Sequence, residues 1–143
     1  MTPKFRAWDS WRKRMSVVDR IYIDTEGVRL YDDFGEYWRD FRDAKLMQST
    51  GLFDKNNKEI FEGDILEIQG IRMVVKFGNY EYIESSKSNG PTIGVVYDGL
   101  GFYVECINVA DPDRISPFEP ETLKESTIIG NRFEKPALLE DKE

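Results

Sequence analysis

Hydrophobic and polar residues alternate in short runs along most of the chain, and few segments carry a long 3.6-residue period. Such alternation predicts half-buried β-strands that end where Gly, Asn, Asp or Pro interrupts the pattern. Residues 4–8 and 15–23 are expected to pair as a hairpin across the polar turn at 9–14. Further strands are expected at 28–31, 45–52, 59–69, 71–77, 80–84, 92–97, 102–109 and 126–133.

Turns and loops are expected between these strands, where residues that tolerate left-handed backbone or break strands gather. Asn56-Asn57 predicts a hairpin tip, and Gly99 and Gly101 predict a turn at 98–101. The Ser-rich segment 85–91 predicts a flexible loop, and the prolines around 115–121 predict an irregular segment.

Two segments favour short helices. In the acidic, aromatic block at 32–43, an apolar residue recurs at i, i+3, i+4 and i+7, the spacing of one helical face. The residues at this spacing are Phe34, Tyr37, Trp38 and Phe41. An ordered loop is the alternative for this block, and its aromatic residues suit either the core or a protein-binding anchor. Pro136 favours a short helix at 136–139.

These elements predict a mainly β, β-rich α+β fold: a small antiparallel, barrel-like sheet with one or two short helices. Residues 1–143 are expected to form a single domain, since no linker divides them. The run Glu62-Gly63-Asp64-Ile65, followed by a returning strand, is similar to the opening of small SH3-like barrels. In this interpretation Gly63 allows a bend and Asp64 accepts a hydrogen bond from a nearby backbone amide.

Composition excludes several classes of chemistry. The chain has a net charge of −7, no histidine and one cysteine, Cys106. Catalysis by Ser-His or Cys-His pairs, zinc sites that need imidazole, and internal disulfides are therefore excluded. No segment approaches the about 20 apolar residues of a membrane span, and residues 1–15 lack the apolar core, about 7–15 residues long, that a secretory signal needs, so we expect no such signal. We expect a cytoplasmic protein.

Four carboxylates lie close in sequence and are candidate ligands for Mg²⁺. They are Glu59, Glu62, Asp64 and Glu67. On a strand, however, their side chains divide between two faces. The nuclease pattern that needs an acid two residues before a strand lysine also fails, because Val74 occupies that place before Lys76. We therefore predict no metal site, no cofactor and no catalytic residues.

Charge is unevenly distributed along the chain. Residues 1–20 carry a net charge of +4, whereas the remainder carries −11. The basic side chains of this segment are interleaved with Trp8 and Trp11 and suit three roles: docking onto an acidic partner or second copy, binding nucleic acid, or forming a solvated turn. The residues that we expect to bind a partner are Trp11, Arg12, Arg14, Tyr37, Trp38 and Phe41.

Three blocks of sequence, in order, resemble the YopX family of phage and prophage proteins. The first is Lys4–Asp9 with Lys13 and Met15; the second comprises 46–52, 54–56 and 60–65; the third is 128–131 with Glu134, Pro136 and Leu138-Leu139. The chain departs from the family pattern at Asn57, Arg132-Phe133 and Lys135. The resemblance implies a phage or prophage origin and a β-rich fold, but no catalytic residues.

The leading hypothesis is a non-enzymatic, oligomeric accessory protein of a phage or prophage, which binds a host or phage protein in the host cytoplasm. The alternative is a nucleic-acid-binding module that uses the basic N-terminal hairpin. A third hypothesis, a carboxylate-metal hydrolase, would depend on Glu62 and Asp64.

Overall fold

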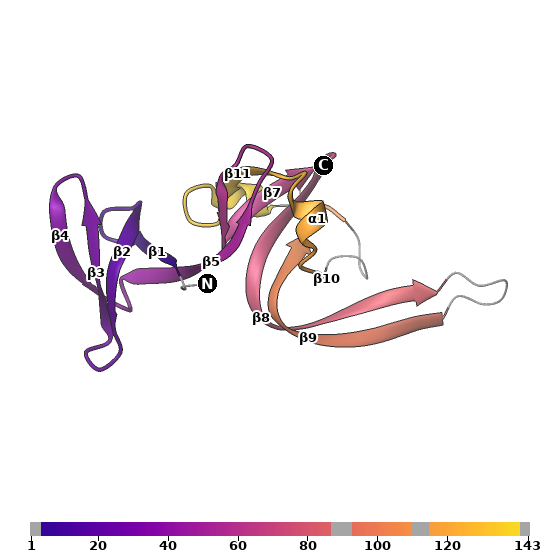
Figure 1. Cartoon of the computed structure of the whole chain (residues 1–143), viewed down its shortest axis with the longest axis horizontal. Helices are drawn as coiled ribbons and strands as arrows, with labels where there is room; N and C mark the ends of the chain where they lie inside the picture. The colour runs from indigo at the N-terminus through magenta and orange to yellow at the C-terminus, as the bar shows by residue number, and fades with distance from the viewer. Residues whose placement is uncertain (1–3, 87–92, 110–114, 141–143) are drawn as a thin grey trace.

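The computed structural model describes residues 4–86, 93–109 and 115–140, which form two antiparallel β-sheets with little helix (Figure 1). This confirms the mainly β prediction. Both sheets curve, and neither closes into a barrel within the described ranges. The interpretation of residues 1–143 as one domain stays a prediction.

The first sheet has the strand order β4-β3-β2-β1-β5-β6. Its strands are β1 (Phe5–Asp9), β2 (Arg14–Tyr22), β3 (Gly27–Asp32), β4 (Gly35–Asp40), β5 (Ala44–Phe53) and β6 (Glu59–Phe61). The predicted hairpin forms, with Asp9 opposite Arg14. Ala7, Val28, Leu30 and Ala44 are buried together at the core of this sheet.

The second sheet has the strand order β10-β9-β8-β7-β11. Its strands are β7 (Asp64–Ile68), β8 (Ile71–Ser86), β9 (Ile93–Cys106), β10 (Ile115–Pro117) and β11 (Thr127–Asn131). Its main core joins Leu66, Val75 and Val104 to Ile60 of β6 and to Leu123 of the four-residue helix α1 (Pro120–Leu123). A predicted helix is confirmed as the 3-10 helix η1 (Pro136–Leu139).

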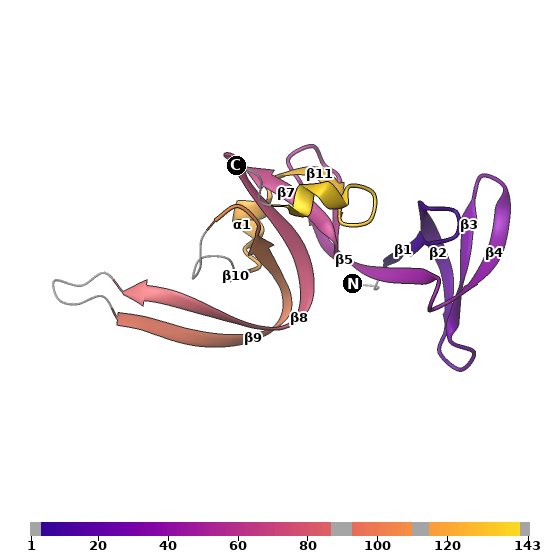
Figure 2. The same cartoon turned by 180° about the vertical axis from the view of Figure 1, so that it is seen from behind.

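Strand β5 links two groups of strands, which are β1–β4 and the five strands of the second sheet (Figures 1 and 2). Its first half pairs with β1, and its second half pairs with β6. Two further contacts join the groups: Arg6 forms an ion pair with the buried Asp64 at 2.6 Å, and Trp8 stacks on Phe133 at 5.8 Å between ring centroids.

A predicted turn and a predicted bend are confirmed around β6, but the strand expected at 59–69 is divided there into β6 and β7. Asn57 has a φ of 61°, and Asp54 Oδ1 accepts hydrogen bonds from the backbone N–H groups of Asn56 and Lys58. Gly63 has a φ of 88° between β6 and β7, and Asp64 Oδ2 accepts a bond from the Phe61 N–H at 2.8 Å.

The predicted helix at 32–43 is wrong, because this block contains strand β4. A tight turn with Gly35 at a φ of 119° returns the chain along β3, where Leu30 lies opposite Tyr37. In a strand, neighbouring side chains point to opposite faces. Pairing with β3 therefore overrides the helical spacing, and the four aromatic residues do not form one face.

The predicted turn at 98–101 is also wrong, because β9 continues through it and pairs with β8 along its whole length. Gly101 lies opposite Gly78, and both have positive φ, of 140° and 149°. The glycines bend the paired strands where the sequence suggests a reversal. In addition, part of the segment expected to be irregular forms β10 and α1. Most of the predicted loop at 85–91 lies outside the described residues.

Candidate protein-binding surfaces

The turn between β1 and β2 is fixed by a buried carboxylate. Asp9 Oδ1 accepts hydrogen bonds from the backbone N–H groups of Trp11 at 2.9 Å and Arg12 at 3.2 Å, and from Arg39 Nε at 3.1 Å. Burial raises the pKa of Asp9, but these bonds and the Arg39 charge outweigh burial and lower the pKa below its ordinary value. The turn is therefore held in one conformation.

Three of the predicted partner-binding residues come together beside this turn. The Arg39 guanidinium lies 4.8 Å from the ring centroids of both Trp11 and Tyr37. The Arg12 guanidinium lies 4.0 Å from the Tyr37 ring, whose hydroxyl hydrogen-bonds to Ser16 Oγ at 2.7 Å. Cation–π contacts thus join the turn to β4, and Trp11 remains 69% exposed.

The basic side chains of this hairpin are mostly engaged in ion pairs. Arg12 and Arg14 share Asp32 Oδ2, at 2.6 and 3.5 Å, and the Asp32 side chain is almost buried. Lys13 is the last residue of the turn, with a φ of 52°; it is exposed and forms no ion pair with another described residue. Of these neighbouring cations, Lys13 is therefore the one available to a partner.

The structure places the other two predicted partner-binding residues elsewhere. Trp38 contacts Tyr22 at 5.5 Å between ring centroids and covers Gly27. Phe41 packs against the buried core of the first sheet. The predicted set therefore divides between a partly exposed cluster beside the turn and side chains committed to packing.

A long ribbon extends from the second sheet, away from the rest of the molecule (Figures 1 and 2). We call residues 79–86 of β8 and 93–100 of β9 the arm. The two strands pair in register from the sheet outward, beyond the bend at Gly78 and Gly101. The sequence did not reveal the arm, because Gly99 and Gly101 suggested that β9 was two strands.

One face of the arm carries a row of tyrosines. Tyr82 and Tyr97 lie opposite each other and stack at 5.2 Å between ring centroids. Nearer the sheet, Tyr80 stacks on Tyr103 at 4.9 Å and lies over Gly99. A Cβ at position 99 would be 2.3 Å from Tyr80 Cζ, so glycine is needed for this packing.

The opposite face of the arm is apolar and exposed. Pairing places Ile83 beside Val96 and Asn79 beside Leu100 on this face, where Val96 is 61% and Leu100 76% exposed. Between these positions Glu81 lies opposite Asp98, both exposed. The same face continues into the sheet and packs against α1 on the inner side of the curve (Figure 1). The exposed apolar face of the arm is therefore a continuation of the face that forms the core of the second sheet.

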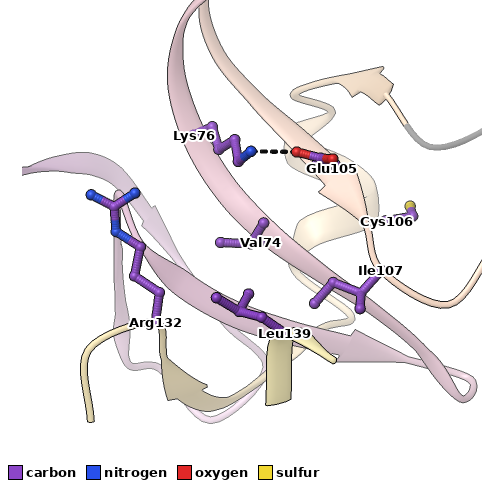
Figure 3. Close-up of a pocket in the computed structure, with 7 residues that line it drawn as sticks. All are labelled: Val74, Lys76, Glu105, Cys106, Ile107, Arg132 and Leu139. Carbon is purple, nitrogen blue, oxygen red and sulfur yellow. Dashed lines mark hydrogen bonds and ion pairs between the residues drawn. The ribbon is translucent and has the colours of Figure 1, made fainter. Parts of the chain in front are cut away.

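A pocket of about 270 Å³ lies on the tyrosine side of the sheet, between β8, β9 and the C-terminal segment (Figure 3). Lys76 and Glu105 form an ion pair at its edge, and Cys106 Sγ points away from that pair. Its other lining residues are Val74, Ile107, Arg132 and Leu139. Apolar and charged side chains therefore line this pocket together.

Two of the four carboxylates considered as metal ligands face protein cations instead. Asp64 pairs with Arg6, and Glu59 pairs with Lys4 at 2.9 Å and bonds to Ser49. Burial raises the pKa of Asp64 although the Arg6 charge opposes it. In the part of the chain that the structure describes, no three His, Cys, Asp or Glu side chains are grouped to hold a metal ion.

The helices of the described ranges are all too short to cross a bilayer.

Comparison with known proteins shows the family and the fold. The family described as "YopX protein" matches residues 4–140. The chain is also similar to the crystal structure of protein EF1440 from Enterococcus faecalis, with 24% sequence identity and a TM-score of 0.52. That alignment covers 98% of this chain and 99% of the other, and at this identity it shows the fold alone. No curated protein matches the chain.

Proposed function

Because this chain belongs to the YopX protein family, we propose that it is a non-enzymatic, oligomeric protein-binding module encoded by a phage or prophage. It binds a host or phage protein in the cytoplasm of the host cell. The arm supplies the principal binding surface, and the turn between β1 and β2 supplies a second one.

The exposed apolar face of the arm carries this proposal. A two-stranded ribbon is at best marginally stable in water on its own. Here such a ribbon extends beyond the sheet with Ile83, Val96 and Leu100 open to solvent. Exposed apolar patches that border polar groups are typical of protein interfaces, where a few large side chains contribute most of the binding free energy. A protein partner would cover this face.

Charge favours a protein over nucleic acid as the partner. The arm contains Glu81, Glu84 and Asp98 and no basic residue. In the hairpin expected to hold phosphates, Arg12 and Arg14 are paired with Asp32. Nucleic-acid binding depends on cations that can replace the counterions of the phosphates, and these pairs reduce the supply of such cations. Nucleic-acid binding is therefore the alternative, and the following experiment distinguishes it from protein binding.

A pull-down from host lysate tests the proposal. Tagged wild-type protein, the arm variant Leu100→Ser and the control variant Ile23→Ser are compared in nuclease-treated and untreated halves of one lysate. Ile23 is also exposed but lies in the turn after β2. We expect a defined protein that survives nuclease, binds wild type and Ile23→Ser equally, and is reduced at least about fivefold with Leu100→Ser.

Circular dichroism spectra must first show that both variants retain the β-sheet content of wild type. Partners that disappear with nuclease would favour the nucleic-acid alternative. Equal capture by all three proteins would contradict the role of the arm.

A further inference from the structure

The apolar face of the arm contains a pair of acids that form no ion pair with another described residue. Glu81 and Asp98 are directly opposite each other in the register of β8 and β9, so their side chains share a face. Like charges at opposed positions of a sheet destabilise it. The two strand segments of the arm, 79–86 and 93–100, have no basic residue to neutralise them, and Lys87 between them lies outside the described residues. A cation from outside the arm, presented among apolar groups, would relieve this repulsion.

The turn between β1 and β2 presents such a cation beside an exposed aromatic ring. In the turn between β1 and β2, Lys13 is the cation without an ion pair to a described residue, and Trp11 exposes most of its ring two positions before it. Asp9 holds the turn in its conformation through the N–H groups of Trp11 and Arg12. A preorganised turn loses little conformational entropy on binding.

The turn and the arm of one molecule cannot meet, since they lie at opposite ends of it in both views (Figures 1 and 2). Two arms stacked through their apolar faces would bring the acidic pairs together, which electrostatic repulsion disfavours. The turn of a second copy is therefore the part of this chain that complements the arm in charge and can reach it.

We propose that the arm of one copy binds the turn of a second copy, with Lys13 between Glu81 and Asp98 and Trp11 against Leu100. This inference rests on the proposed protein-binding function and names its partner as another copy of the chain. The two contact surfaces differ, so the contact is head-to-tail and repeats from copy to copy. It generates a ring if the rotation closes and a filament if it does not.

Reciprocal charge reversal tests this contact. Lys13→Glu and the double variant Glu81→Lys/Asp98→Lys are studied alone and mixed, by sedimentation velocity across a range of concentrations. We expect wild type to self-associate more strongly at low salt than at high salt. Each variant alone should show a dissociation constant raised about tenfold or more, because like charges then meet. The equimolar mixture should recover association, because each turn then faces an arm of opposite charge.

Lys55→Glu is the control for the change in net charge, since Lys55 lies in the exposed turn between β5 and β6. It should associate as wild type does. A wild type that stays monomeric at every concentration would overturn the inference, as would a mixture that does not recover association. The proposed function fails separately, if the protein captured from lysate does not depend on Leu100.

Discussion

At the scale of single residues, the pair Arg6–Asp64 joins the two groups of strands through a buried charge. Asp64 is 1% exposed, and its two oxygens bond to Arg6 Nη2 and to the Phe61 N–H. The Arg6 guanidinium also lies 4.7 Å from the Phe61 ring centroid. Removal of the cation would leave a carboxylate in an apolar site, which is costlier than the loss of the attraction itself.

We expect Arg6→Met to lower the free energy of unfolding by about 3–5 kcal/mol at pH 7. Burial raises the pKa of Asp64 and the Arg6 charge lowers it, so the variant should have a still higher pKa at this carboxyl. The folded variant then binds more protons than its unfolded state, and its deficit should shrink from pH 7 to pH 5. Urea denaturation at both pH values measures this.

Two further variants control this prediction. Arg6→Met/Asp64→Asn should regain part of the loss, because no buried charge remains. Lys124→Met removes an exposed ion pair with Glu121 and should cost less than about 1 kcal/mol. A deficit of equal size at pH 7 and pH 5 would contradict the proton uptake by Asp64.

At the scale of elements, the hairpin of β3 and β4 depends on a glycine beneath a tryptophan. A Cβ on Gly27 would be 2.1 Å from Trp38 Cζ2, closer than atoms in contact can be. We expect Gly27→Ala to cost about 1–3 kcal/mol, as overpacking in a core does. Urea denaturation of Gly27→Ala, Trp38→Leu and the double variant measures their coupling.

Since Trp38→Leu removes the ring that the new methyl group would strike, the double variant should be more stable than the sum of the single changes predicts, by about 1 kcal/mol. Purely additive effects would show that Trp38 does not cover Gly27. That result would also weaken the strand assignment of β4, because the contact comes from the pairing of β3 with β4.

At the scale of the whole molecule, buried carboxylates predict how stability depends on pH. Burial raises the pKa of Asp9, Asp54 and Glu59, yet hydrogen bonds outweigh it and lower each pKa below its ordinary value. Asp54 accepts such bonds from the N–H groups of Ile128, Lys58 and Asn56. At these three carboxyls the unfolded chain therefore binds more protons in acid than the folded chain does.

Stability from these groups is present at neutral pH and is lost as pH falls below about 4, where the carboxylates of the unfolded chain take up protons. Urea denaturation between pH 7 and pH 3 should show this decline. Asp54→Asn should lower stability at pH 7 and reduce the decline, whereas Asp24→Asn, in an exposed turn, should leave both unchanged. A free energy of unfolding that stays constant down to pH 3 would contradict the prediction.

The sequence by itself determined what depends on local physics. Alternating side chains predicted most strands, because a strand buries every second residue. Asn56-Asn57 identified a turn and Gly63 a bend, because asparagine and glycine tolerate left-handed backbone there. The absence of histidine excluded whole classes of catalytic site, whatever the fold.

Tertiary structure decided what depends on distant partners. The segment 32–43 has helical spacing, but it forms strand β4 because it pairs with β3. Strand β9 continues through the turn predicted at 98–101 because it pairs with β8 there. Asp32 lies eighteen or more positions from Arg12 and Arg14 in the sequence. The sequence therefore could not show that Asp32 forms ion pairs with both arginines, whereas Lys13 has no ion pair with a described residue. The arm likewise became visible only as a paired ribbon, because exposure is a property of the assembled sheet.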